Sequence, residues 1–326
     1  MIVDTSRYLC YIELDLKHCM PYGRKENVMR WQNIRSGKLA EEIEKSKGVC
    51  VLCMGCVEHH GKHLPLGQDV LAGKIVELAS EKEPVVMFPD MYFGEKTGAG
   101  EFQGTIIFSN KLIFDILTET CNEIGRNGFK KIVIVGCHGG NTSMINNFIR
   151  STLYTPKDYM VMGLRCSSTW PRPKDMLAII DGGNRDYFPE LTDEDIALLR
   201  DVDANNKVYG HGCFIETAVA LGLHPELVDK SMIGKIDGNN AHRLEGFQLE
   251  SGVYTPYGWM ADYPNSLSSD YNAGNERIGR SVVKYAVDKM AEKLRIIKED
   301  TTLEDYHNEW RAKQELIKEG KWDLLQ

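Results

Sequence analysis

The chain has 326 residues, of which 42% are apolar and 26% are charged, and this composition is ample for a large globular core. The formal net charge is −8 and no segment is dominated by Lys and Arg, which argues against nucleic acid or an anionic membrane as a partner. No stretch approaches the roughly 18 apolar residues of a membrane span, and residues 1–11 lack the features of a signal peptide. We therefore expect a cytoplasmic protein whose nine cysteines are reduced thiols.

The first half of the chain alternates apolar runs with segments of helical spacing. After a short apolar-polar start at 9–16 and a helix at 36–47, strands are predicted at 49–57, 84–88, 131–135 and 160–165. Helices are predicted at 68–81, at 110–127 and from residue 142 onward, the last with Asn141 or Thr142 as its cap. This alternation predicts an α/β fold, in which a parallel sheet carries helices on both faces.

The second half departs from that alternation. Residues 167–203 combine a Trp-Pro-Arg-Pro sequence, a Gly-Gly turn and an acidic helical run, which indicates an insertion near the site, either a lid or an interface arm. A short apolar helix at 217–223 precedes a loop-rich second insertion at 234–272 and two helices at 276–297 and 303–325. We expect one main domain, 1–298, and a C-terminal helical extension, 299–326.

Metal-ligating side chains follow two of the predicted strands. Glu58, His60 and Asp69 come after the strand at 49–57, and His138 follows the strand at 131–135. Because ligands of parallel sheets bind beyond the carboxyl ends of the strands, these four side chains are expected to lie together. A carboxylate such as Asp69 has two oxygens and can bridge two cations. The mixed set of imidazoles and carboxylates suits Zn²⁺, Mn²⁺ or Fe²⁺ rather than Ca²⁺.

These residues belong to motifs that resemble a known family. The motifs are Glu58-x-His60-Gly61-x-His63-Leu64-Pro65-Leu66-x-x-Asp69, Phe102-Gln103-Gly104-Thr105, His138-Gly139-Gly140-Asn141, and His211-Gly212 with Glu216. In this order they resemble the creatininase (creatinine amidohydrolase) family over most of residues 49–228. The resemblance implies a three-layer α/β/α sandwich with a mostly parallel sheet, a binuclear metal centre, and hydrolysis of a C–N bond in a cyclic or linear amide. It also implies a homo-oligomer, often a hexamer.

The resemblance assigns a role to each of the four ligand candidates. Glu58 and His138 would hold one metal ion, His60 would hold the other, and Asp69 would bridge them. Two divalent ions per chain are therefore expected, with zinc favoured and manganese or iron as alternatives.

The match departs from the creatinine-hydrolysing members at Gly140, where those enzymes carry a further glutamate ligand. Glu216, at the start of a predicted helix, is our candidate for the missing carboxylate. His211 matches the family histidine that handles protons at the scissile bond, so His211 and Glu216 are the expected catalytic residues. His63 and Asn141 are expected to orient the ligands without binding metal. The departure at Gly140 weakens the case for creatinine itself, and the sequence does not reveal the substrate.

Two other kinds of protein stay open at this stage. Cys50, Cys53 and Cys56 form a C-x-x-C-x-x-C run that could serve an iron–sulfur redox protein, although residues three apart on a strand point to opposite faces. The loss of a family carboxylate could mark an inactive member that acts in binding or assembly.

Trp170 and Trp259 are expected in loops on the side of the site.

Overall fold

The centre of the protein is a parallel sheet whose strand order is β2-β1-β3-β4. The computed structural model describes residues 28–205, 210–247, 251–253, 255–268 and 274–321, so the expected start at 9–16 lies outside the described residues. The strands are β1 (Val49–Met54), β2 (Val86–Met87), β3 (Lys131–Gly136) and β4 (Met160–Arg165). Every residue of β1 and β3 is buried, which explains why both read as continuous apolar runs.

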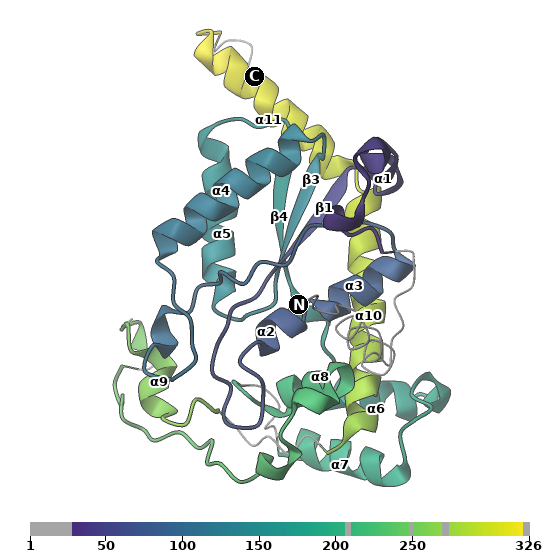
Figure 1. Ribbon diagram of the computed structural model, residues 1–326, viewed down its shortest axis with the longest axis vertical. Helices are drawn as coiled ribbons and strands as arrows, with labels where there is room; N and C mark the ends of the chain where they lie inside the picture. Colours follow the sequence, from purple (N-terminus) through teal and green to yellow (C-terminus); the bar gives the residue numbers. More distant parts are fainter. Residues whose placement is uncertain (1–27, 206–209, 248–250, 254, 269–273, 322–326) are drawn as a thin grey trace, which may run out of the picture.

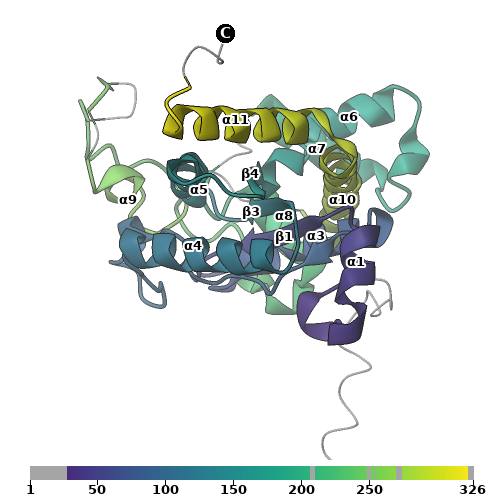
Figure 2. The ribbon, with the colours of Figure 1, turned by 90° about the horizontal axis from the view of Figure 1, so that it is seen from above.

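Helices cover both faces of the sheet (Figures 1 and 2). One face carries α4 (Asn110–Arg126) and α5 (Asn141–Ser151), and the other carries α3 (Lys74–Lys82), α8 (Phe214–Leu223) and α10 (Glu276–Glu299). Successive strand residues alternate between the two apolar clusters, with Val51 and Val133 on the α3 side and Leu52 and Ile132 on the α4 side. The three-layer α/β/α architecture predicted from the sequence is confirmed.

The remaining α-helices are short or peripheral: α1 (Leu39–Lys45), α2 (Gln68–Leu71), α6 (Pro173–Asp181), α7 (Asp193–Ala204), α9 (Gly258–Asp262) and α11 (Thr302–Lys318). The single helix predicted at 68–81 is wrong, because the chain turns at 72–73 and forms α2 and α3 instead. The turn lets α2 lie directly on the end of β1, where a Cβ at Gly55 would come within 2.8 Å of the Val70 nitrogen. Gly55 therefore sets how closely α2 approaches the sheet.

Residues 167–203 do not form a lid. Their helices α6 and α7 bury Met176, Leu177 and Leu199 in the same apolar cluster as α8 and α10, and Trp170 joins that cluster with 8% of its surface exposed. Apolar side chains at helical spacing need a partner surface, and here the partner is the core of the main domain. The expectation of a lid is therefore wrong.

The C-terminal helix lies away from the carboxyl edge of the sheet. The Lys131 ammonium, at the first residue of β3, lies 3.8 Å from Glu304 in α11, so this helix sits at the amino ends of the strands (Figure 1). The sequence predicted a helix at 303–325; α11 ends earlier, at Lys318, and residues 322–325 lie outside the described residues. Within the described part of the chain, no helix combines the length and apolarity needed to cross a membrane.

The connections between strands determine where a site can form. The chain passes from β1 to β2 through α3 on one face, and from β2 to β3 through α4 on the other. β2 and β3 therefore flank β1 on opposite sides. In parallel sheets, a ligand site forms where two neighbouring strands send their connections in opposite directions. Here that position lies beyond the carboxyl ends of β1 and β3.

Candidate metal centre

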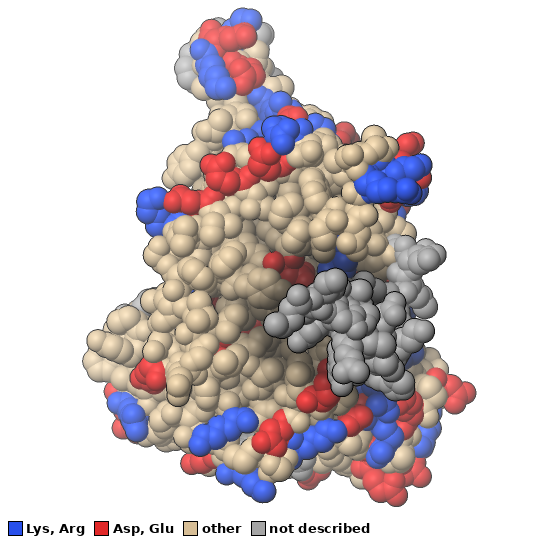
Figure 3. Space-filling model, in the orientation of Figure 1, with Lys and Arg blue, Asp and Glu red and all other residues tan. Residues whose placement is uncertain are grey.

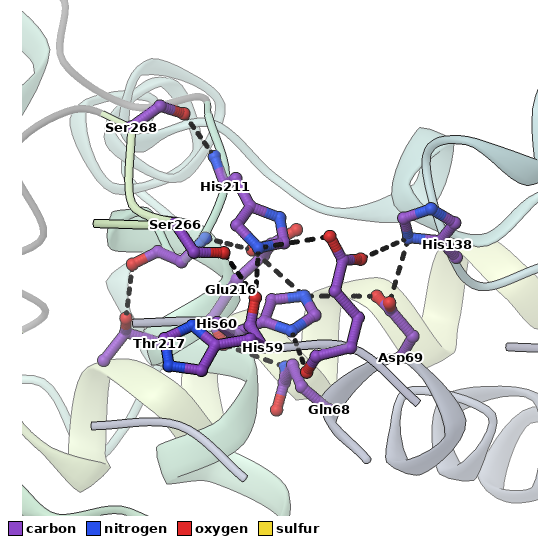
Figure 4. A network of polar contacts seen from close by, with 12 residues as sticks. His59, His60, Gln68, Asp69, His138, His211, Glu216, Thr217, Ser266 and Ser268 are labelled. Carbon is purple, nitrogen blue, oxygen red and sulfur yellow. Dashed lines mark hydrogen bonds and ion pairs between the residues drawn. The ribbon is translucent and has the colours of Figure 1, made fainter. Parts of the chain in front are cut away.

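Segments that are distant in the sequence meet at the carboxyl ends of β1 and β3 (Figure 4). Glu58 and His60 leave the end of β1, Asp69 lies in the first turn of α2, and His138 follows β3. Glu216 lies in the first turn of α8. The structure therefore brings together all five residues that the sequence indicated as metal ligands.

One group of ligand atoms consists of Glu58, Asp69 and His138. His138 Nδ1 lies 3.1 Å from Glu58 Oε2 and 2.9 Å from Asp69 Oδ2. The exposed fractions of these residues are 0%, 3% and 6%, so water solvates none of the three freely. Two carboxylates and one imidazole thus converge on a single point.

A second group shares one of these carboxylates. His60 Nε2 lies 3.6 Å from Asp69 Oδ1 and 4.0 Å from Glu216 Oε2. Asp69 therefore turns one oxygen toward His138 and the other toward His60 (Figure 4). A carboxylate placed between two groups of ligand atoms is well suited to bridge two cations.

The pKa values of His60, His138 and Asp69 depend strongly on one another. Burial by itself would lower the pKa of His60, but Asp69, Glu58 and Glu216 outweigh it and raise that pKa to about 10. His138 follows the same pattern, because Asp69 and Glu58 overcome burial and raise its pKa. Burial would raise the pKa of Asp69, yet the two imidazoles hold it well below its usual range. Without a metal ion, protons on the imidazoles thus balance the carboxylates.

Glu216 and His211 complete the wall of the centre. Burial raises the pKa of Glu216 to about 7, although its Oε2 accepts a hydrogen bond from the Gly212 nitrogen at 2.6 Å. Burial and the nearby charge of His60 hold the pKa of His211 well below its usual value. The His211 ring stacks on His60 with centroids 4.1 Å apart, and the His211 and Trp259 ring centroids are 4.8 Å apart. Trp259 therefore lies beside the site as expected, but in the short helix α9 rather than in a loop.

Asn141 and His63 support the centre from behind. Asn141 Nδ2 donates to the Met54 carbonyl at 2.9 Å, and its Oδ1 accepts from the Glu95 nitrogen at 2.8 Å. It does not cap α5, whose cap residue is Gly140, so the capping prediction is wrong. His63 Nε2 hydrogen-bonds with the Thr217 hydroxyl at 2.9 Å, which fixes the start of α8.

The arrangement fits divalent cations. His60 Nε2 is buried and has no hydrogen-bond partner among the described residues, since 3.6 Å to Asp69 is too long for one. A buried nitrogen without a partner is costly unless a ligand satisfies it. Imidazole and carboxylate donors that surround such an atom match the ligand preferences of zinc, manganese and iron.

Sequence patterns did not point to two further members of the centre. Lys96, 6% exposed, extends its Nζ to 2.6 Å from Glu58 Oε1 and lies 5.1 Å from the centre of the Trp259 ring. Cys56 Sγ lies 3.2 Å from Asp69 Oδ2. Lys96 comes from the loop between β2 and α4 and lies outside the motif at 102–105 of that loop. Cys56, in contrast, precedes Glu58 by two residues, and that spacing could have placed both on one side of the chain.

Comparisons with known proteins agree with this geometry. Residues 32–294 match the family model for creatininase, described as creatinine amidohydrolase. The chain belongs to the creatininase family. A creatinine amidohydrolase of Pseudomonas putida is 25% identical over 267 residues, covering 78% of this chain and 92% of that protein.

Solved creatininases share the fold of this chain. A crystal structure of creatinine amidohydrolase has a TM-score of 0.62 at 18% identity and covers 84% of this chain and 99% of its own. A mutant creatininase of zinc–zinc type has a TM-score of 0.60 at 20% identity, with 84% and 99% covered. A creatininase in a manganese form has a TM-score of 0.58 at 18% identity, with 84% and 100% covered.

The family position at Gly140 has no room for a carboxylate in this creatininase-family chain. A Cβ at Gly140 would lie 2.6 Å from His138 Nε2 and 3.1 Å from the Glu95 carbonyl. Any side chain there would displace His138 or the loop that carries Lys96. The carboxylate nearest to His60 after Asp69 comes instead from α8, through Glu216.

The cysteine run does not form a shared metal site. Cys50 belongs to the apolar cluster under α4, Cys53 belongs to the cluster under α3, and Cys56 faces Asp69. The first two thiols therefore lie on opposite faces of the sheet. An iron–sulfur cluster needs its thiolates around one centre, so this geometry contradicts the redox alternative.

Proposed function

We propose that this chain is a metal-dependent amidohydrolase that uses two divalent ions to hydrolyse a cyclic or linear amide. Membership of the creatininase family makes it a hydrolase that acts on carbon–nitrogen bonds. The observation that supports the metal-dependent mechanism is the sharing of Asp69 between two groups of buried ligand atoms. An inert scaffold would have no physical need for five convergent ligands.

In this proposal the residues divide between two positions. Glu58 and His138 would hold one ion, His60 and Glu216 would hold the other, and Asp69 would serve both. Bound divalent ions would supply Lewis acidity, which polarises an amide carbonyl and acidifies water. Zinc is the favoured ion, with manganese or iron as alternatives.

We propose that His211, whose Nε2 lies 3.4 Å from Glu58 Oε1, transfers protons at the scissile bond. Its Nε2 lies 2.7 Å from the His59 carbonyl oxygen, which can only accept, so the neutral ring carries its proton on Nε2. Nδ1 therefore bears the lone pair. Because the pKa of His211 is well below its usual value, the ring is neutral near pH 7 and can accept a proton through Nδ1.

The backbone nitrogen of His211 donates to Ser268 Oγ at 2.6 Å, which fixes the segment that carries the ring. Glu216 is the second candidate for protonating the departing nitrogen only where it does not bind the ion, because burial raises the pKa of the metal-free carboxyl to about 7.

We also propose a cytoplasmic homo-oligomer, with a hexamer as the expected form. An area of mostly uncharged side chains lies between the charged upper and lower rims in Figure 3. Large apolar side chains are exposed in and near the loop at 92–107: Leu66, Tyr92, Phe93, Ile106, Ile107 and Leu112. Exposed apolar groups that gather in this way favour contact between protein chains.

The proposed function is tested by metal analysis together with an assay panel. We expect about two zinc, manganese or iron ions per chain, and turnover of at least one substrate among lactams, cyclic ureas, formamides and short peptides. His211→Ala should retain its ions and lose about 100-fold or more of the rate, as expected for a general acid–base group. A chain that binds two ions and turns over none of these compounds would favour the inactive binding protein, and a chain without bound ions would contradict the proposal.

A further inference from the structure

A cysteine that the proposed function does not use lies inside the metal centre. Cys56 is fully buried, and its Sγ lies 3.2 Å from Asp69 Oδ2 and 3.8 Å from Glu58 Oε2. His138 Nδ1 completes the group at 2.9 Å from the same Asp69 oxygen. The ligand atoms of these four residues all lie within 4.8 Å of one another.

The separations match those of four ligands around one ion. Zinc lies about 2.3 Å from a cysteine sulfur and about 2.0 to 2.2 Å from a histidine nitrogen or carboxylate oxygen, so neighbouring ligands at tetrahedral angles are about 3.3 to 3.7 Å apart. Of the distances among Cys56, Glu58, Asp69 and His138, those of 2.9, 3.1 and 3.2 Å are slightly shorter than this range and that of 3.8 Å is slightly longer, so small shifts would seat an ion. A simple hydrogen bond from Cys56 to Asp69 would not require the other two groups at the same point.

The net charge of a centre loaded with two ions would leave room for one more anionic ligand. Three carboxylates and the buried Lys96 ammonium contribute to it, so two divalent ions would leave an excess of positive charge in a site shielded from water. Uncompensated charge in such surroundings is costly. A sulfur ligand at Cys56 would reduce this excess by one unit.

We propose that Cys56 is a thiolate ligand of the ion held by Glu58, Asp69 and His138, and that it makes this position select zinc over manganese. The inference rests on the proposed function, because it requires the binuclear centre. Thiolates favour zinc, whereas carboxylate and carbonyl oxygens suit manganese. The other position, formed by His60, Asp69 and Glu216, contains no sulfur and lacks this preference.

Cobalt substitution provides a direct test. Cobalt(II) bound to a thiolate gives a sulfur-to-metal charge-transfer absorption in the near ultraviolet, in addition to the visible bands that nitrogen and oxygen ligands produce. We expect this absorption in the wild-type cobalt protein and its loss in Cys56→Ser, with the visible bands retained. Cys121→Ser is the matched control, because Cys121 is buried in the cluster under α4, away from the centre, and should keep the absorption.

Cys56→Ser also separates a ligand from a hydrogen-bond donor, because the serine hydroxyl can still donate to Asp69. In competition with a chelator, we expect its zinc affinity to fall by about 100-fold or more, since even outer ligand partners contribute about 10- to 100-fold. Its manganese affinity should change by less than about tenfold. Unchanged zinc affinity would show that Cys56 only donates a hydrogen bond and would overturn the inference.

The remaining outcomes distinguish this inference from the proposed function. Visible cobalt bands without the sulfur absorption in the wild type would overturn the role of Cys56 and leave the metal centre standing. The absence of all cobalt bands would contradict the proposed function as well. If Cys56→Ser does not fold, X-ray absorption of the wild-type zinc protein gives the answer, because a sulfur neighbour at about 2.3 Å supports the ligand and its absence refutes it.

Discussion

Asp69→Asn is the most direct test of whether the Asp69 carboxylate serves both metal positions. Asparagine has nearly the same shape, but it replaces one oxygen by an amino group and removes the negative charge. Asp69 faces His138 at 2.9 Å and His60 at 3.6 Å, so the loss is felt in both groups of ligand atoms. We therefore expect both ions to be lost together rather than one alone.

The size of the effect can be approximated from the charge that the substitution removes. Two unit charges about 4 Å apart interact by about 4 kcal/mol at an effective dielectric constant near 20, and a divalent ion doubles that value. Desolvation of the carboxylate offsets much of this gain. A net loss of about 3 kcal/mol per ion remains reasonable, which corresponds to about 100-fold in each dissociation constant. The metal content after dialysis should then fall from about two ions per chain to well below one.

The assay is elemental analysis by inductively coupled plasma mass spectrometry, combined with chelator competition. Asp195→Asn is the matched control, because Asp195 is 2% exposed and its Oδ2 lies 2.8 Å from Arg277 Nε, outside the centre. This variant should lose about 2 to 3 kcal/mol of unfolding free energy and keep both ions. Wild-type metal content and affinity in Asp69→Asn would refute the bridging role.

Three further predictions follow from the same region. Lys96→Met removes a buried ammonium 2.6 Å from a ligand carboxylate, and chelator competition should show about tenfold tighter zinc binding because a repelling charge is gone. Weaker binding would instead mean that Lys96 positions that carboxylate. Gly55→Ala introduces a Cβ 2.8 Å from the backbone of α2 and should cost about 1 to 3 kcal/mol in denaturant unfolding, whereas Gly67→Ala, with no atom within 4 Å, should cost much less. Equal losses in the two variants would contradict the close approach of α2. In the metal-free protein, burial opposes but the surrounding carboxylates raise the pKa of His60 from 6.5 to about 10. A raised histidine pKa stabilises the fold fully below 6.5 and ceases to do so as the pH rises through 10, so Tm in the presence of a chelator should fall between pH 7 and 10. A Tm that rises over this interval would show that His60 is not held as an imidazolium.

The sequence predicted the central layer of the fold well. Continuous apolar runs identified β1 and β3, because a strand that is buried on both faces is apolar at successive positions. The sequence wrongly predicted a single helix at residues 68–81. Close packing of α2 against Gly55 divides that segment into two helices. The sequence also wrongly suggested a lid at residues 167–203. An amphipathic pattern shows which face of a helix is apolar, but it does not show which surface that face packs against.

Local order in the chain predicted which side-chain types make up the candidate metal centre. Glu58, His60 and Asp69 lie within twelve residues after a strand, and His138 directly follows another strand. The sequence alone therefore predicted the types of candidate ligand and the sheet edge that they share. Only the tertiary structure decided which further groups face them. Lys96 and Cys56 acquire their significance from contacts with Glu58 and Asp69, and the charge of a buried group depends on its neighbours in space rather than in sequence.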